Sequence, residues 1–182
     1  MLAALKSFCL KKNTASNTAK VLLASILIAF AANLKISIDI IPFTMQTMVV
    51  LTISYALGSR LALFSLILWF LEGLCGFPVF ASGGGLHAIL SPSGGYIFGL
   101  IVMGYIMGKA KDHDINNVFT LSLYALVATA VLYICGLFVL SFYVPKDKIL
   151  SIGLYPFIVT DIAKAFCAAL LINPAYKIFK NL

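Results

Sequence analysis

The chain has 182 residues, of which 62% are hydrophobic and only 10% are charged, and its formal net charge is +7. Soluble domains are typically about half apolar and a quarter charged, so this composition excludes an ordinary soluble protein and indicates an integral membrane protein. The lysines and arginines are scattered between apolar segments, as topology determinants are, which argues against a nucleic-acid partner. No polar block is long enough for a soluble catalytic or ATP-binding domain. We therefore expect residues 1–182 to form a single domain in the lipid bilayer.

The first 18 residues are expected to be a cytoplasmic leader or a short interfacial helix. Their positive charges follow a short apolar piece instead of preceding it, and no small-residue cleavage site closes the segment. Both features argue against a signal peptide. A helical bundle is expected to occupy about residues 19–179.

Six apolar segments make up that predicted bundle. A spanning helix needs about 20 mainly apolar residues. The segments lie at about 19–36, 43–57, 61–75, 94–107, 118–144 and 154–179. The second and third are short for a full span, so they require tilting or buried non-helical ends. The predicted fold class is an all-α integral membrane protein with six transmembrane helices.

A glycine-rich segment, GFPVFASGGGLHAILSPSGG, separates the third and fourth apolar segments at residues 76–95. Irregular backbone at membrane depth must be buried in protein or line a cavity, so we expect this loop to pack between spans 3 and 4. Gly84 would allow close backbone approach to a ligand or to a packed helix. Tyr96, which follows the loop, would either stack on a ligand or anchor the chain at the membrane interface.

The distribution of positive charge predicts the orientation. With six spans both termini lie on one side, and that side carries nine lysines and arginines against three on the other: Lys6, Lys11, Lys12, Lys20, Arg60, Lys109, Lys111, Lys177 and Lys180 against Lys35, Lys146 and Lys148. The positive-inside rule then places both termini in the cytoplasm. The glycine-rich segment and the start of the sixth span are expected to face the outer side.

Asp161 and Lys164 lie inside the sixth segment, in a stretch with no other charge between Lys148 and Lys177. A charged side chain at the centre of a membrane helix costs roughly 2.5–3.5 kcal/mol on insertion scales, so it needs a partner or a polar cavity. Their i,i+3 spacing puts both on one helix face, close enough to pair or to bind one ligand together. The pair is therefore either a binding site open to the outside or a structural ion pair.

Weaker signals accompany this pair. Thr44 and Gln46 open the second segment near the same outer boundary, where they would line a pocket or cap the helix. Ser25 and Ala29 in the first segment form a small-xxx-small pattern, which permits close approach of another helix.

Several motifs are absent from the sequence. It contains no Walker A sequence, no HExxH and no serine nucleophile elbow. The four cysteines show no metal-ligand spacing, so we expect no metal and no cofactor. The segments also show no inverted repeat, which argues against a carrier that works alone by alternating access.

Three stretches together resemble the BioY family: IPFTMQTMVVLTISYALGSRLA, LEGLCGFPVFASGGGLHAILSPSGGYIFG and TDIAKAFCAAL. The resemblance covers nearly all of residues 42–170. Family motifs of the type PFTxQ, G-x-PVF and GGY occur in this order. TDIAKA matches the family's GDxxKA at Asp161 and Lys164, with Thr160 in place of glycine. SPSGGY matches GPTGGY with Ser91 and Ser93 as conservative changes.

This resemblance implies the fold of the substrate-binding (S) component of an energy-coupling-factor (ECF) transporter, and capture of biotin from outside the bacterial cytoplasmic membrane. It implies a transmembrane coupling subunit and two ATPase subunits as partners, although some family members occur alone. Small residues on the first helix contact the coupling subunit in related S components, which makes Ser25 and Ala29 the matching positions. The expected ligand contacts are Asp161, Lys164, Gly84, Tyr96, Gln46 and Thr44.

The binding pose and the function both retain alternatives. In one pose Asp161 accepts a hydrogen bond from a ureido N–H of biotin while Lys164 donates to the ureido carbonyl. In the other, Lys164 pairs with the valerate carboxylate. The alternative functions are an S component for another small vitamin and a membrane-embedded enzyme that uses Asp161 as a general base.

Overall fold

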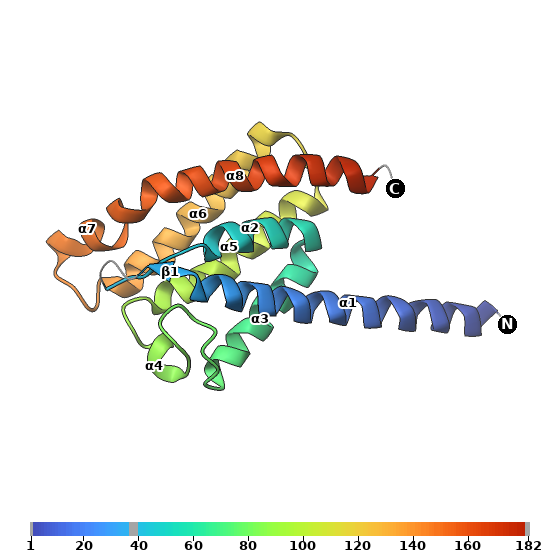
Figure 1. The fold of residues 1–182 in the computed structure, drawn as a ribbon, viewed down its shortest axis with the longest axis horizontal. Coiled ribbons are helices and arrows are strands. Elements are labelled where there is room, and N and C mark those ends of the chain that lie inside the picture. Colours follow the sequence, from blue (N-terminus) through green and yellow to red (C-terminus); the bar gives the residue numbers. More distant parts are fainter. Residues whose placement is uncertain (1, 37–39, 181–182) are drawn as a thin grey trace.

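The computed structural model describes the backbone of residues 2–36 and 40–180 and the side chains of residues 15–36 and 40–173. The chain is almost entirely helical (Figure 1). In order, the elements are α1 (Leu2–Asn33), β1 (Lys35–Ile36), β2 (Phe43–Thr44), α2 (Gln46–Leu57), α3 (Ser59–Leu74), α4 (Leu86–Ile89), α5 (Gly94–Asp112), α6 (Val118–Leu140), the 3-10 turn η1 (Lys146–Lys148), α7 (Ile149–Gly153) and α8 (Tyr155–Lys180).

Each of the six predicted apolar segments overlaps one of the longer helices. Among the described residues, three stretches are long and apolar enough to cross a membrane: Ala15–Asn33, Val118–Leu140 and Lys146–Asn173. α2 has only 12 residues. At 1.5 Å per residue it is about 18 Å long, well short of the roughly 30 Å hydrocarbon core. The three long apolar stretches indicate a membrane protein. Because α2 is short, six full spans remain a prediction.

Three helices begin or end several residues away from the predicted segment bounds. α5 ends at Asp112 rather than near Met107. α1 begins at Leu2 rather than near residue 19, so the predicted leader is continuous with the first helix. Residues 2–18 contain neither glycine nor proline, so nothing in the backbone interrupts the helix there. α6 ends at Leu140 rather than at Val144. Pro145 disfavours a helical conformation at the residue before it, which accounts for the earlier end.

Helix α5 is the centre of the bundle and packs against α2, α3 and α6. Glycines allow this close approach. A Cβ on Gly108 would lie 2.5 Å from the Cα of Ser59, and one on Gly95 would meet the carbonyl oxygen of Cys135. Around α5 the fully buried side chains include Leu66, Trp69 and Met103. The core is thus built from close backbone contacts filled by large apolar side chains.

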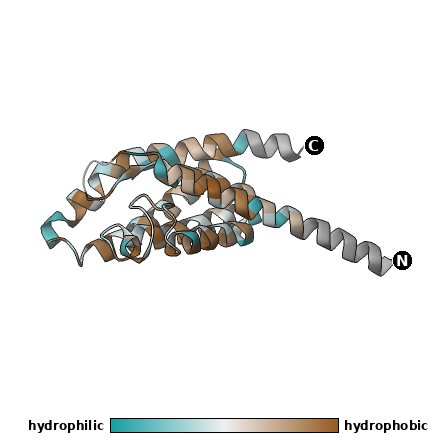
Figure 2. Cartoon of the chain, turned by 60° about the horizontal axis from the view of Figure 1, so that its bottom comes forward, coloured by the Kyte–Doolittle hydropathy of each residue, from teal (hydrophilic) through white to brown (hydrophobic). Residues whose placement is uncertain are grey.

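Large apolar side chains also cover the outside of the molecule. Apolar residues run along most of the helix length (Figure 2). Ile134, Phe138 and Phe30 are each more than 60% exposed. In water such a surface would be unfavourable, whereas in a bilayer it contacts lipid chains.

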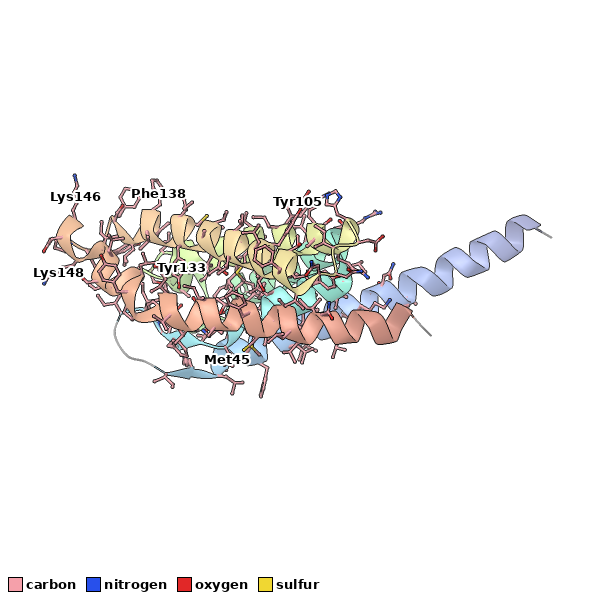
Figure 3. All side chains as sticks on the ribbon, turned by 90° about the horizontal axis from the view of Figure 1, so that it is seen from above. Met45, Tyr105, Tyr133, Phe138, Lys146 and Lys148 are labelled. Atoms are coloured by element: carbon pink, nitrogen blue, oxygen red, sulfur yellow. The ribbon has the colours of Figure 1, made fainter. Side chains whose placement is uncertain are left out.

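The two ends of the bundle differ. α1 begins and α8 ends at the same end, while α4 and α7 lie toward the opposite end (Figure 1). Lys146 and Lys148 project from that opposite end, and Tyr133 lies inside the bundle (Figure 3).

A short antiparallel hairpin at the α4 end pairs Lys35 with Thr44 and Ile36 with Phe43. It is attached to the glycine-rich segment, because the Lys35 ammonium donates to the carbonyl oxygen of Ala81 at 2.5 Å. The Trp69 indole N–H donates to the carbonyl of Val79 at 2.9 Å and holds the same segment against α3. The irregular backbone therefore has hydrogen-bond partners within the protein, as membrane burial requires.

We expect Gly108→Val to destabilise the bundle, because its side chain would overlap the backbone of Ser59, which cannot move aside as a flexible side chain can. Overpacking of this kind typically costs about 1–3 kcal/mol. Thermal unfolding of the detergent-purified protein measures the effect. The control is Val102→Ala, at an exposed position on the same helix. Equal melting temperatures for both variants would contradict the close α3–α5 contact.

Candidate functional site

Asp161 and Lys164 form a buried ion pair on α8. The ammonium Nζ of Lys164 lies 2.8 Å from Oδ1 of Asp161. The two residues are only 6% and 8% exposed. The predicted pairing of these two charges is therefore confirmed, and both are withdrawn from the lipid.

Two hydroxyl groups from other helices complete the surroundings of the Asp161 carboxylate. The phenol of Tyr133 on α6 donates to Oδ2 at 2.6 Å. The hydroxyl of Thr47 on α2 donates to Oδ1 at 3.2 Å. These bonds to the charged form lower the cost of burying it, and they join α2, α6 and α8 at one point. Sequence reasoning missed both residues. A tyrosine in the interior of an apolar segment, away from the interfacial belt, was the available signal for Tyr133.

The Lys164 ammonium also has contacts from more than one element of the fold. Besides Asp161, it donates to the backbone carbonyl of Thr44 at 2.8 Å. It also lies 4.1 Å from the centroid of the Phe43 ring, within the range of a cation–π contact. The ring of Phe43 in turn stacks on Phe157, with centroids 6.4 Å apart and an interplanar angle of 12°. Lys164 therefore holds strand β2 against α8.

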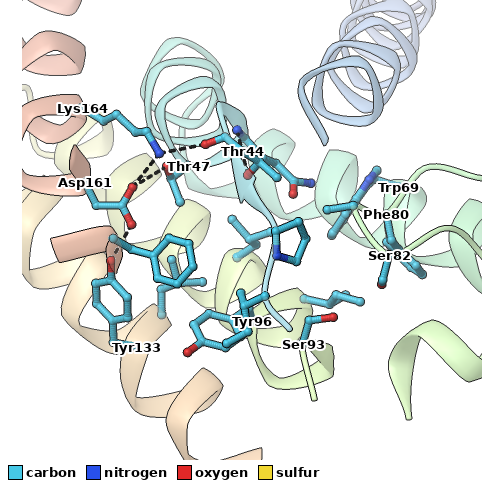
Figure 4. Close-up of a pocket in the computed structure, with 18 residues that line it drawn as sticks. Thr44, Thr47, Trp69, Phe80, Ser82, Ser93, Tyr96, Tyr133, Asp161 and Lys164 are labelled. Atoms are coloured by element: carbon cyan, nitrogen blue, oxygen red, sulfur yellow. Dashed lines mark hydrogen bonds and ion pairs between the residues drawn. The ribbon is translucent and has the colours of Figure 1, made fainter. Parts of the chain in front are cut away.

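A cavity with a volume of about 80 Å³ lies beside this network (Figure 4). Its walls come from the hairpin, α2, α3, the glycine-rich segment, α5, α6 and α8. The polar and charged lining residues are Thr44, Gln46, Thr47, Ser82, Ser93, Asp161 and Lys164.

Aromatic side chains form much of the remaining wall. Trp69 meets Phe80 edge to face, with ring centroids 4.9 Å apart. Tyr96 meets Tyr133 in the same manner at 6.5 Å. The Tyr96 hydroxyl donates to the carbonyl of Gly153 at 2.8 Å, which fixes the ring at the cavity wall. Figure 4 places Ser82 and Ser93 away from the Asp161–Lys164 pair, with aromatic side chains between. The cavity thus has two polar regions separated by an apolar middle.

Gln46 and Thr44, both predicted pocket residues, line this cavity. The backbone N–H of Gln46 donates to the hydroxyl of Thr44 at 3.3 Å. Gln46 is only 4% exposed. Its amide nitrogen Nε2 is buried with no hydrogen-bond partner among the described residues.

A sequence model of the BioY family matches residues 6–181. The chain belongs to the BioY family. It is 33% identical over 147 residues to the biotin transporter BioY of Thermotoga maritima, covering 80% of this chain and 86% of that one. It is 29% identical over 181 residues to a probable biotin transporter BioY of Lysinibacillus sphaericus, covering 94% and 92%.

A solved structure extends the comparison to the fold of this BioY family member. The crystal structure of the S-component for biotin from an ECF-type ABC transporter matches with a TM-score of 0.80. The match covers 91% of this chain and 93% of the other, at 23% sequence identity. At this identity the likeness establishes the S-component fold.

Two positions singled out from the sequence have close contacts within this BioY chain. Gly84 is not among the cavity-lining residues, and a Cβ there would meet the carbonyl oxygen of Phe77. The backbone that lies close to Gly84 is therefore another part of the same glycine-rich segment. Ser25 is 0% exposed, and its hydroxyl donates to Glu72 on α3 at 2.5 Å. The Ser25 hydroxyl is therefore used within the chain, and contact of this position with a coupling subunit stays a prediction. Ala29 is half-buried and its partner contact stays a prediction.

Removing one charge of the buried pair should cost more than removing both. Lys164→Met leaves Asp161 buried without its cation, and breaking a buried pair in this way typically costs about 3–5 kcal/mol. The double variant Asp161→Asn/Lys164→Met should recover much of this loss. Thermal unfolding without ligand measures it, with Lys146→Met at an exposed lysine as control. A double variant less stable than Lys164→Met alone would contradict this account.

Proposed function

We propose that this chain captures biotin at the outer side of the bacterial cytoplasmic membrane, as the substrate-binding component of an ECF-type transporter. Its family and the names of its relatives support the ligand. The observation that carries the proposal is the cavity whose polar end is the buried Asp161–Lys164 pair.

The chemistry of that cavity suits biotin. The ureido ring of biotin carries two N–H donors and one carbonyl acceptor, its fused ring and aliphatic tail are apolar, and its carboxylate lies at the far end. Asp161 is an acceptor for a ureido N–H. The rings of Trp69, Phe80 and Tyr96 give the apolar part of the ligand a matching wall. Ser82 and Ser93 offer hydroxyl groups to the carboxylate. In this proposal Asp161, Lys164, Thr44, Gln46 and Tyr96 form the biotin site.

The orientation of the proposed transporter component follows from charge. The predicted topology places nine lysines and arginines on the side where α1 begins and α8 ends (Figure 1), so this end is assigned to the cytoplasm. The hairpin and the glycine-rich segment then lie on the outer side, where biotin would enter.

Uptake in this proposal depends on other subunits. A transmembrane coupling subunit and two ATPase subunits would supply the energy, with Ala29 on α1 as the proposed contact to the coupling subunit. The chain itself would be a binding component with no cofactor and no catalytic step.

Biotin binding to the purified protein tests this function. Wild type should bind biotin and leave it chemically unchanged, and Asp161→Ala should weaken binding roughly 10-fold to 100-fold or more, because a charge-assisted hydrogen bond is lost. Isothermal titration calorimetry gives the affinities, and mass spectrometry of the recovered ligand detects turnover. Asp147→Ala, which removes an exposed carboxylate, is the matched control.

Three outcomes would contradict the proposal. Tighter binding of another vitamin would make that vitamin the substrate. A product formed from biotin would favour the enzyme. A biotin affinity that is unchanged in Asp161→Ala would show that Asp161 is not part of the binding site. Co-purification with the ATPase subunits tests the coupling partners separately.

A further inference from the structure

A groove separate from the cavity lies on the outside of the bundle, between α1 and α3, which pack against each other. Its volume is about 650 Å³. Three residues of α1 and six of α3 line it: Asn17, Thr18, Val21, Arg60, Leu61, Phe64, Ile67, Leu68 and Leu71. None of these residues lines the cavity beside the ion pair, so the groove is a second feature of the molecule.

Most of the groove is apolar and has the length of one membrane leaflet. Leu61, Phe64 and Leu68 follow the helical spacing that puts side chains on one face of α3. Phe64 and Leu71 are each 50% exposed. From Arg60 to Leu71 the helix rises about 16 Å at 1.5 Å per residue. Half of the roughly 30 Å hydrocarbon core is about 15 Å, so one acyl chain of one leaflet fits along this face.

The remaining end of the groove is polar and positively charged. The Arg60 side chain is exposed and has no ion pair or hydrogen bond among the described residues. The carboxylate of Asp112 instead accepts from the N–H and the hydroxyl of Ser59, the residue before Arg60. Lys20 is exposed on α1, about one helical turn from Asn17, and adds a second positive charge near this end.

Other cations assigned to the cytoplasmic end already have contacts within the chain. The ammonium groups of Lys109 and Lys111 lie 5.5 Å and 5.7 Å from the ring centroids of Tyr105 and Tyr55. The Arg60 guanidinium has no such contact in the described part of the chain. A guanidinium matches the geometry of a phosphate group, which accepts two parallel hydrogen bonds from it. Basic pockets between membrane helices on the cytoplasmic side are typical sites for anionic phospholipids.

We propose that this groove binds one anionic phospholipid of the cytoplasmic leaflet. Its phosphate lies at Arg60, and one acyl chain lies along α3 between Phe64 and Leu71. A zwitterionic headgroup would bring its own positive charge close to Arg60 and Lys20, so an anionic lipid is favoured. This inference goes beyond the proposed function: it uses the membrane orientation assigned above and does not depend on biotin.

Native mass spectrometry of the detergent-purified full chain tests the site. The protein is incubated with equal amounts of dioleoyl-phosphatidylglycerol and dioleoyl-phosphatidylcholine, and wild type should retain more of the anionic lipid. Arg60→Gln should lower the ratio of bound phosphatidylglycerol to bound phosphatidylcholine about 5-fold or more, because a cation near the membrane surface is lost. Arg60→Lys, which keeps the charge, should retain most of the preference.

Two controls restrict the effect to the groove. Lys109→Gln removes a cation at the same end but outside the groove lining, and it should leave the lipid ratio unchanged. The biotin affinity of Arg60→Gln should equal that of wild type, because Arg60 does not line the cavity. Glycerol 3-phosphate, a headgroup without acyl chains, should fail to displace phosphatidylglycerol even in 10-fold excess.

Four outcomes would overturn the inference. A lipid ratio unchanged in Arg60→Gln would remove Arg60 from the site, and an equal fall in Lys109→Gln would indicate general attraction to positive charge. Displacement by glycerol 3-phosphate would indicate a site for phosphate alone. An Arg60→Gln variant that keeps its lipid but no longer co-purifies with the coupling subunit would assign the groove to that subunit.

Discussion

The contact between the Asp161 carboxylate and the Lys164 ammonium is the constraint on which the rest of the site depends. Two charges inside a membrane-spanning helix persist only if each is compensated. Tyr133 and Thr47 donate to the carboxylate, while a carbonyl and an aromatic ring of strand β2 face the ammonium. Because these groups come from α2, α6 and the hairpin, satisfying the pair also fixes how those elements meet around the cavity.

Much of this could be predicted from the sequence, since the information is local. Apolar segments of sufficient length give helices, and the i,i+3 spacing of Asp161 and Lys164 gives their pairing. The partners of the pair are a different matter. Thr47 lies 114 residues from Asp161 in sequence, and the acceptor for Lys164 is a backbone carbonyl 120 residues away. Every residue has a backbone carbonyl, so residue type does not show which one accepts from Lys164. The contacts of the ammonium are therefore seen only in the structure.

The predictions for small residues show why such patterns are ambiguous. A glycine or a serine tells where the chain allows close approach, but not which neighbour comes close. At Ser25 the neighbour is Glu72 of α3, within the same chain. At Gly84 it is the backbone of Phe77, a few residues earlier in the glycine-rich segment. In both cases intramolecular packing uses the space that the sequence pattern offered to a partner or a ligand.

The central claim is that the ion pair stays intact and presents Asp161 to the ureido ring. A structure of the protein with biotin bound, determined by crystallography or cryo-electron microscopy, tests it most directly. The account predicts a ureido nitrogen within hydrogen-bond distance of Asp161 and the Lys164 ammonium still bonded to Asp161 and Thr44. A Lys164 side chain turned away from Asp161 and paired with the valerate carboxylate would contradict it.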